Sequence, residues 1–327
     1  MKNIYSNIFS YNKKSLDKTI ANLKKGNIVG LPTETVYGLA GNAYLKMVVN
    51  KIYKLKKRPK INPLIVHFYD YKDAEKDVIL NENFFKLYKK FCPGPITFIL
   101  KKKNKSKVDP IVSANLNTIA VRFPNHKIIR SILKKITFPL AMPSANISSS
   151  VSPVSAEDVA DEFKKTLRFI LDGGKSKIGI ESTVINLTGK PSILRPGIID
   201  AKTITKTLKT KINFLKKNSK IISPGMLKRH YSPGIPIILN RLPVNGKMAC
   251  ITLGKKYKNN SNWFNLSKKS NLKEAASNLY KTLRKIKKLK FKKIYVTKIP
   301  NFGVGIAIND RLKRAAKKNE IRSNKSK

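Results

Sequence analysis

The sequence predicts an α/β fold because short apolar runs that suit strands alternate with segments of helical periodicity. Residues 28–31 and 63–66 are the first two such runs. Between them, apolar residues recur at the i, i+3, i+4, i+7 spacing of one helical face, and Pro59 stops the helix after a basic end. That face consists of Leu45, Val48, Val49, Ile52 and Leu55.

Polar side chains follow each of these three elements. Thr33 and Thr35 come after the first strand, Lys56 and Arg58 end the helix, and His67 ends the second strand. Ligands of α/β sheets bind outside the ends of strands. We therefore expect these residues to face one pocket.

The rest of the first 200 residues adds further strands and helices. Helices are expected from Ser15 to Gly26, over residues 84–91, and after Ser155. Arg122 lies in an apolar strand, where a charge is costly unless it is ion-paired or faces a ligand, and the sequence leaves both roles open. Strands are expected over residues 96–100, 119–123, 138–142 and 169–171, and over the pair 182–187 and 192–195.

A second, smaller α/β domain is predicted after residue 236. Residues 198–220 are rich in Lys and Thr with weak periodicity, and residues 223–234 form a segment bounded by Pro and Gly. Strand-like runs at 235–239, 248–253 and 294–297 then alternate with helices at 272–289 and 303–314. We therefore expect a first domain over 1–215, a linker over 216–236, a second domain over 237–317 and a disordered basic tail over 318–327.

The charge of the chain is strongly positive, since 69 basic and 18 acidic residues give +51. Such a charge is typical of proteins that bind nucleic acids or other polyanions. However, only 11 of the 69 basic residues are Arg, and the lysines are spread along the whole chain. We attribute the excess to an A+T-rich coding bias, with weak non-specific RNA affinity as a side effect.

Composition also indicates a cytoplasmic location. No apolar run is long enough to span a membrane, and the first residues lack the apolar core of a signal peptide. Two cysteines, Cys92 and Cys250, give neither a disulfide framework nor a metal cluster, so no protein-bound metal is expected.

The candidate site combines cations with hydroxyl and amide groups. The cations are Lys56, Arg58, Arg122 and Arg195. The sequence contains no metalloprotease motif, no nucleophile elbow and no Cys–His pair. This set suits an anionic, phosphate-bearing ligand better than nucleophilic catalysis by the protein.

Eight motifs, taken in order, resemble the YrdC-like family of threonylcarbamoyl-AMP synthases in its longer, two-domain form. Each motif alone has low specificity, whereas the ordered set covers nearly the whole chain. The motifs are PTETVYGL (32–39), KKRPKINPLIVH (56–67), AVRFP (120–124), PSAN (143–146), GIESTVI (179–185), LRPG (194–197), SPGMLKRHYSP (223–233) and GVGIAINDRLKRAA (303–316).

The resemblance implies a twisted mixed sheet with flanking helices around a basic cavity, plus a small Rossmann-like C-terminal domain. It implies condensation of L-threonine, bicarbonate and ATP, with Mg²⁺, to L-threonylcarbamoyladenylate and pyrophosphate. Other proteins then transfer the threonylcarbamoyl group to the adenosine at position 37 of tRNAs that read codons starting with A. The linker is implied to fold over the active site.

The resemblance also implies roles for individual residues. Lys56, Arg58, Ser144 and Asn146 are implied to be catalytic. Contacts to ATP are implied for Arg58, Asn62, Thr118, Ser144, Ser152, Arg195 and Tyr231. Contacts to threonine are implied for Thr35, His67, Arg122, Met142 and Ser182.

Two positions depart from the family pattern. Met142 stands where Ala is expected, so it either narrows the threonine pocket or points away from it. Lys57, in place of a small residue, is expected to add charge near the phosphates.

Two other functions remain open. One is a non-catalytic RNA-binding or ribosome-maturation factor of YrdC-like fold, which would not need a complete threonine site. The other is a module for carbamoyl transfer to a different acceptor, which would predict further catalytic domains or zinc-finger cysteines.

Overall fold

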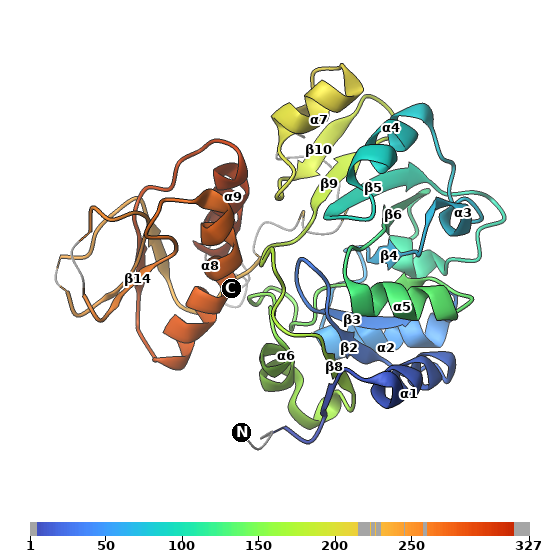
Figure 1. The fold of residues 1–327 in the computed structure, drawn as a ribbon, viewed down its shortest axis with the longest axis horizontal. Coiled ribbons are helices and arrows are strands. Elements are labelled where there is room, and N and C mark those ends of the chain that lie inside the picture. The colour runs from blue at the N-terminus through green and yellow to red at the C-terminus, as the bar shows by residue number, and fades with distance from the viewer. Residues whose placement is uncertain are drawn as a thin grey trace, which may run out of the picture.

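The structure is a computed structural model that describes residues 5–214, 223, 226, 230–244, 246–257 and 260–316. In this described part, the chain folds into two sheets with helices packed on them (Figure 1). The larger sheet belongs to the first 214 residues and the smaller one to residues 237–296. This architecture confirms the predicted α/β class.

The larger sheet has eleven strands among the described residues, in the order β1-β8-β2-β3-β7-β4-β6-β5-β9-β10-β11. Parallel and antiparallel pairs both occur: β4 and β6 are parallel, whereas β5 and β6 are antiparallel. The strands are β1 (Ile8–Ser10), β2 (Val29–Leu31), β3 (Gly38–Asn42), β4 (Ile65–His67), β5 (Ile96–Lys101), β6 (Thr118–Arg122), β7 (Leu140–Ala141), β8 (Ile170–Asp172), β9 (Thr183–Asn186), β10 (Ser192–Arg195) and β11 (Asn213–Phe214).

Helices flank this sheet and bury their apolar sides against it. Helices α2, α4 and α7 share one apolar cluster with β4, β5 and β6, while α1 and α5 share another with β2 and β8. The helices are α1 (Lys13–Lys24), α2 (Lys46–Lys56), α3 (Tyr71–Ala74), α4 (Glu82–Phe91), α5 (Lys127–Lys135), α6 (Ala156–Phe163) and α7 (Ala201–Leu208), with 3₁₀ turns η1 (Pro110–Ser113) and η2 (Lys164–Thr166).

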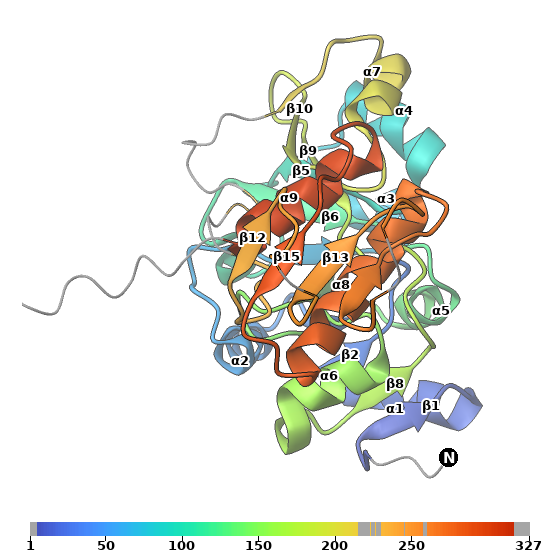
Figure 2. The same ribbon diagram turned by 90° about the vertical axis from the view of Figure 1, so that its left-hand side faces the viewer.

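The C-terminal unit is a small parallel α/β structure. Its sheet has the order β12-β15-β13-β14, and its two helices lie between that sheet and the larger one (Figures 1 and 2). Its apolar core includes residues of the first unit as well, such as Val151, Val154 and Ile180. The elements are β12 (Ile237–Leu239), β13 (Ala249–Thr252), β14 (Trp263–Asn265), α8 (Leu272–Lys288), β15 (Ile294–Val296) and α9 (Val304–Ala316).

Strand β3 is the main difference from the sequence prediction, which had no strand there. Its sequence, GLAGN, is poor in the β-branched and aromatic residues that favour strands. Tight packing explains the glycines. A Cβ at Gly41 would lie 2.5 Å from Val48 Cγ1, and a Cβ at Gly38 would lie 2.5 Å from Met142 Cγ.

Smaller differences concern helix ends and short elements. Asn12 is the N-cap of α1, and Ser15 forms the other half of its capping box three residues later. Helices α3, α5 and α7 and strands β1, β11 and β14 were not predicted. Of the 1–215, 216–236, 237–317 and 318–327 division, the tail and most of the linker lie outside the described residues, so those boundaries stay a prediction.

Candidate functional site

The loop between β2 and β3 is held together by the hydroxyl group of Thr33. Thr33 Oγ1 donates to the carbonyl of Val36 at 2.6 Å and accepts from the backbone N–H of Thr35 at 3.1 Å. It also lies 2.9 Å from Thr35 Oγ1. These bonds form a closed turn, which fixes the direction of Glu34 and Thr35 beside the neighbouring strands.

Arg122 and His67 are neighbours in the register of two parallel strands, β4 and β6. Both side chains are buried. Arg122 Nη2 donates to Glu34 Oε1 at 2.7 Å and to Thr35 Oγ1 at 2.8 Å. Arg122 is therefore ion-paired, the first of the two roles that the sequence left open. Because Arg122 also lines a cavity, it can face a ligand as well, which is the second role.

Helix α2 ends so that two basic side chains point in defined directions. Lys57 adopts a left-handed conformation, with φ of 49°, which turns the chain. Lys56 Nζ donates to the carbonyls of Ser144 and Asn146, and therefore ties the 144–146 loop to the helix. Arg58 donates from Nε and Nη2 to Asn62, at 2.9 and 2.7 Å, and from Nη2 to the Pro63 carbonyl at 2.7 Å.

On the other side, β9 and β10 position Ser182 and Arg195. The pairing register shifts between Ile193 and Arg195, as in a β-bulge, which turns a side chain out of the regular alternation. Arg195 donates from Nε to the Ser182 carbonyl and from Nη2 to Ser182 Oγ, both at 3.0 Å. Ser182 Oγ also lies 2.7 Å from Thr97 Oγ1.

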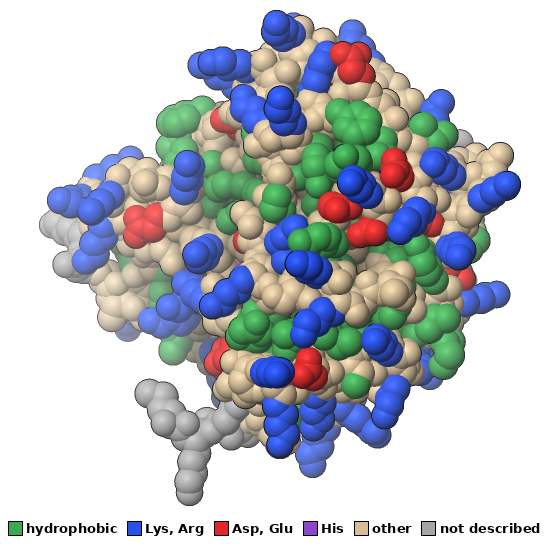
Figure 3. Space-filling model, turned by 45° about the vertical axis from the view of Figure 1, so that its right-hand side comes forward, with side chains coloured by type: hydrophobic (Ala, Val, Ile, Leu, Met, Phe, Trp, Pro, Cys, Tyr) green, Lys and Arg blue, Asp and Glu red, His purple; other side chains and the backbone are tan. Residues whose placement is uncertain are grey.

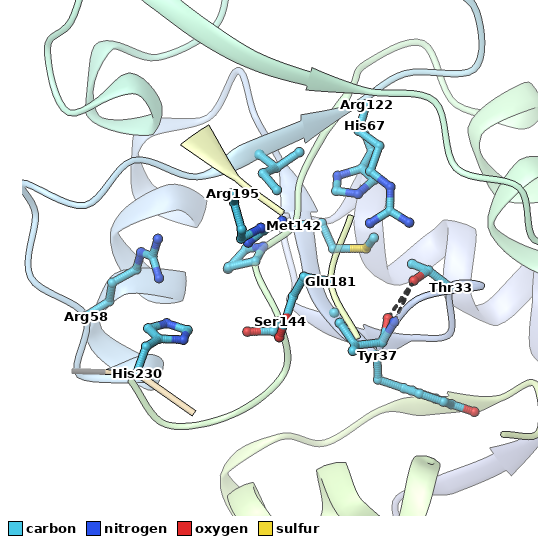
Figure 4. A pocket seen from close by; sticks show the side chains of 14 residues that line it. Thr33, Tyr37, Arg58, His67, Arg122, Met142, Ser144, Glu181, Arg195 and His230 are labelled. Atoms are coloured by element: carbon cyan, nitrogen blue, oxygen red, sulfur yellow. Dashed lines mark hydrogen bonds between the residues drawn. The ribbon is translucent and has the colours of Figure 1, made fainter. Parts of the chain in front are cut away.

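These elements surround a cavity that is partly open to solvent (Figure 4). Three arginines line it: Arg58 from the loop after α2, Arg122 from β6 and Arg195 from β10. The full lining is Thr33, Val36, Tyr37, Gly38, Arg58, Ile65, His67, Arg122, Met142, Pro143, Ser144, Glu181, Arg195 and His230.

Buried polar atoms around this cavity have no hydrogen-bond partner among the described residues. More than nine in ten buried polar groups are normally hydrogen-bonded, so a cluster of exceptions indicates a place for a ligand or for water. The exceptions around the cavity are Glu34 Oε2, Asn62 Nδ2, both ring nitrogens of His67, Arg122 Nε, Asn146 Oδ1, His230 Nδ1 and the Tyr231 hydroxyl.

Burial in this cationic environment shifts the pKa of several groups. Burial, and then the charge of Arg122, lowers the pKa of His67 well below its usual value, although the carbonyls of Ile65 and Leu140 oppose this. Burial lowers the pKa of His230 to about 3 and that of Arg58 to about 10. Both imidazoles are therefore neutral near pH 7 and suited to hydrogen bonding rather than to carrying charge.

The structure brings seven of the residues that the sequence predicts for the site to the cavity wall: Thr33, Arg58, His67, Arg122, Met142, Ser144 and Arg195. Thr35, Asn62 and Ser182 form a layer behind it, hydrogen-bonded to the three arginines. Ser152 lies behind Glu181 and donates to it at 2.6 Å. Asn146 is buried, and its Nδ2 donates to the carbonyls of Ile147 and Ser150.

Four expectations need correction or qualification. Thr118 lies at the far end of β6, about 13 Å from Arg122 at about 3.3 Å per residue, and lines a different hollow. Lys57 is exposed and lines a separate groove, so it does not add charge to the cavity. Lys56 is bonded to carbonyls and does not line the cavity, and Tyr231 is buried behind it.

The outcome for Met142 is clear. Its side chain is buried, lines the cavity and packs on Gly38 (Figure 4). It therefore narrows the pocket rather than pointing away.

Sequence reasoning missed two acidic residues, Glu34 and Glu181, although both lie inside quoted motifs. Each is buried and paired with an arginine. The signal was available, because an acidic residue within an otherwise apolar or small-residue motif is costly to bury unless it is paired.

Two family profiles match the chain. One, named for Sua5, YciO and YrdC and described as "Telomere recombination", matches residues 21–197. The other, described as "Threonylcarbamoyl-AMP synthase, C-terminal domain", matches residues 199–317. The chain is 34% identical over 319 residues to the threonylcarbamoyl-AMP synthase of Pyrococcus abyssi, a match that covers 90% of this chain and 92% of the relative.

The chain belongs to the threonylcarbamoyl-AMP synthase family. Another member, from Bacillus subtilis, is 34% identical over 328 residues, with 94% of each chain covered. The crystal structure of P. abyssi Sua5 complexed with L-threonine matches with a TM-score of 0.86 at 31% identity, covering 95% of this chain and 97% of that one. Members of this family are enzymes, and this match confirms the predicted two-domain α/β fold.

No group of three or more His, Cys, Asp or Glu side chains is arranged to hold a metal ion within the described ranges. None of the helices that the structure describes is long and apolar enough to cross a membrane. On the face shown in Figure 3, basic side chains are scattered rather than gathered in one patch.

Proposed function

We propose that this chain condenses L-threonine, bicarbonate and ATP to L-threonylcarbamoyladenylate and pyrophosphate in the cavity described above. The observation that carries the proposal is the cluster of buried, unpartnered polar atoms on and behind a cavity wall that also holds three arginines. Such groups are costly to bury without partners, and a zwitterionic amino acid together with a polyphosphate would supply them.

Threonine would bind at the end where Arg122 and His67 lie. Arg122 uses Nη2 for Glu34 and Thr35, whereas its Nε has no partner and remains available for the threonine carboxylate. The neutral His67 ring offers a hydrogen bond to the amino acid. Met142 forms the wall against the threonine side chain, with Thr35 and Ser182 behind.

The nucleotide would bind at the end where Arg58, Arg195 and Ser144 lie. Threonine and bicarbonate form an N-carboxylate with loss of water, and one carboxylate oxygen attacks the α-phosphorus of ATP while pyrophosphate leaves. Arg58 and Arg195 would stabilise the negative charge on the departing group. Catalysis would therefore rest on positioning and electrostatics, without a protein nucleophile.

Most of the other predicted nucleotide residues would position the residues of the cavity wall instead of touching the nucleotide. Lys56 would hold the carbonyls of the 144–146 loop in place, while Asn62 and Ser152 would orient Arg58 and Glu181. Tyr231 would close over the nucleotide if the linker moves toward it. Thr118, at the far end of β6 and in a different hollow, would take no part in this site.

Mg²⁺ would enter with ATP as part of the substrate. Glu181 on the cavity wall and Glu34 beside Arg122 are each already paired with an arginine, so they fit a protein-bound cation poorly. The metal, when bound to the phosphates, would supply further neutralisation of their charge.

The product would serve tRNA modification in the cytoplasm, where other proteins transfer the threonylcarbamoyl group to adenosine 37 of tRNAs reading codons that start with A. Weak tRNA binding is part of the proposal. A wide groove away from the cavity supports it, since four lysines and an arginine line it: Lys51, Lys54, Lys57, Lys164 and Arg168.

Pyrophosphate release tests this function. The purified chain is incubated with ATP and Mg²⁺, with and without bicarbonate and L-threonine, and beside L-serine and glycine. We expect release that requires both threonine and bicarbonate. Release with serine but not threonine would change the substrate, and no release with any amino acid from a folded, RNA-binding protein would favour the non-catalytic alternative.

A further inference from the structure

A buried polar cluster joins the C-terminal unit to the wall of the cavity. Arg311 on α9 and Tyr280 on α8 come from the C-terminal unit, whereas Glu181 and Ser152 come from the first. All four side chains are buried, and the Arg311 side chain has no exposed surface. None of the proposed substrates needs to touch Arg311, so its role is not explained by the reaction itself.

Glu181 is the centre of this cluster. Its Oε2 accepts from Arg311 Nε at 2.9 Å and from the Tyr280 hydroxyl at 2.8 Å, and its Oε1 accepts from Ser152 Oγ at 2.6 Å. Glu181 also lines the cavity (Figure 4). The next residue, Ser182, is hydrogen-bonded to Arg195. The carboxylate therefore lies between the C-terminal unit and the proposed nucleotide-binding groups.

Arg311 is held through Nε and Nη1, whereas its Nη2 has no hydrogen-bond partner among the described residues. Besides Glu181, Nη1 donates to the Pro196 carbonyl and to Asp310, each at 2.9 Å. Its guanidinium also lies over the ring of Tyr231, 5.0 Å from the ring centre, and that ring stacks on Tyr280. A lysine has no planar fork with which to reproduce these contacts.

We propose that Arg311 is a positioning residue for the active site: as the counterion of Glu181, it holds that carboxylate, and through it Ser152, in the geometry that the nucleotide requires. The C-terminal unit thus completes the catalytic cavity instead of being only attached to it. This inference rests on the proposed function for its kinetic readout.

Charge supports this assignment. Burial alone would raise the pKa of Glu181, but the charge of Arg311, followed by that of Arg195, brings it to about 2. The groups that face Glu181 are Arg311 on α9, Tyr280 on α8, Arg195 on β10, Ser152 and His230. Without Arg311, the carboxylate loses its largest compensating charge, so it would protonate more readily or move toward Arg195.

Docking of the two units has independent supports. Gly179 approaches α8 so closely that a Cβ would lie 2.6 Å from Ser277 Cα. Lys288 on α8 forms an ion pair with Asp161 on α6 at 2.6 Å. The Lys288 side chain is far more exposed than that of Arg311, and this pair does not include Glu181. Replacing Lys288 therefore removes a contact between the units and leaves Glu181 untouched, which makes it a matched control.

The test is a double-mutant cycle on Arg311→Met and Glu181→Gln, with Arg311→Lys and Lys288→Met beside it. Folding is checked by circular dichroism, the KM for ATP and kcat by pyrophosphate release, and nucleotide affinity by calorimetry. We expect Arg311→Met to lower kcat/KM for ATP by about 100-fold, the order of loss that a misplaced active-site group causes. The loss should deepen as the pH falls from 8 to 6, and Lys288→Met should stay within about twofold of wild type.

The cycle separates positioning from packing. If Arg311 acts through the Glu181 charge, adding Arg311→Met to Glu181→Gln should lower kcat/KM for ATP by less than about fivefold further. Arg311→Lys should then be more active than Arg311→Met. The proposal would be overturned if the losses in kcat/KM of the two single variants simply multiplied in the double variant while the pH profile stayed unchanged. Wild-type kinetics of folded Arg311→Met would also overturn it. If wild type releases no pyrophosphate, the proposed function fails, and equal ATP affinity of wild type and Arg311→Met by calorimetry would then overturn the inference separately.

Discussion

Replacing Arg58 by alanine would separate the chemistry of the cavity from the stability of the fold. Arg58 lines the cavity and makes three hydrogen bonds to the loop that follows α2. The two effects of the substitution on stability have opposite signs, and their sizes follow from the structure.

Loss of three hydrogen bonds from a charged donor destabilises the protein by about 1.5 kcal/mol each, the low end for charged groups, or about 4.5 kcal/mol in all. Against this, burial lowers the pKa of Arg58 from 12.5 to about 10, which means that the folded state disfavours the buried charge by about 3 kcal/mol at about 1.4 kcal/mol per pKa unit. Removing the charge relieves this cost, and water from the open cavity can reach the freed carbonyls. We therefore expect the free energy of unfolding to change by less than about 2 kcal/mol.

Activity should respond far more strongly. A preorganised charge that stabilises the departing group is worth about 10²–10³ in kcat. We expect pyrophosphate release by Arg58→Ala to fall by at least that factor while thermal unfolding shifts by less than about 8 °C.

Kinetics and thermal unfolding are measured on Arg58→Ala and on Lys57→Ala. Lys57 is the next residue in the chain but lies exposed in another groove, so its replacement should leave pyrophosphate release near wild type. Wild-type release by Arg58→Ala, or an equal loss in both variants, would refute the assignment of Arg58 to the nucleotide site.

Three other perturbations test separate parts of the cavity. Met142→Ala should lower the free energy of unfolding by about 2 kcal/mol, the low end for a buried methionine because water can fill the space. It should also raise pyrophosphate release with L-valine relative to L-threonine, and unchanged selectivity would contradict the assignment of Met142 to the pocket wall. Because the pKa of His230 is about 3 in the folded state and about 6.5 unfolded, its contribution to stability is complete above pH 6.5 and falls as the pH decreases. From pH 7.5 to 5 we expect the free energy of unfolding in urea to fall by about 2 kcal/mol, and His230→Gln should reduce this loss. An equal loss in both proteins would argue against this role of His230. Arg122→Met should raise the KM for threonine and cost about 3–5 kcal/mol of stability, because it leaves Glu34 unpaired. The double variant Arg122→Met/Glu34→Gln should recover stability while its KM for threonine stays high. Recovery of both stability and KM would contradict the role of Arg122.

The sequence predicted the elements whose pattern is strong and local. The apolar face of α2 and the runs of β4, β5 and β6 appear where expected because burial on one or both sides dictates their residues. Strand β3 was missed because close packing on Met142 and Val48 requires glycine, which disfavours strands elsewhere. Helix α7 was missed because its sequence, AKTITKTL, buries only Ile204 and Leu208 and includes three threonines.

The candidate site followed from the motifs, whereas its layering did not. Lys56 and Arg58 are two residues apart, yet one holds a loop and the other faces the cavity. Only the geometry distinguishes these roles, since spacing gives neither side-chain direction nor depth. The partners of Glu34 and Glu181 are 88 and 130 residues away in sequence, so local patterns could not pair them.

The most direct test of the central claim is to follow the carbon of [¹⁴C]bicarbonate into a nucleotide product. We expect label in an adenylate that forms only when ATP and L-threonine are both present, with an equal amount of pyrophosphate released. We also expect almost no label with Arg58→Ala and normal labelling with Lys57→Ala. Labelled product without threonine, or pyrophosphate release without any label in the adenylate, would contradict this claim.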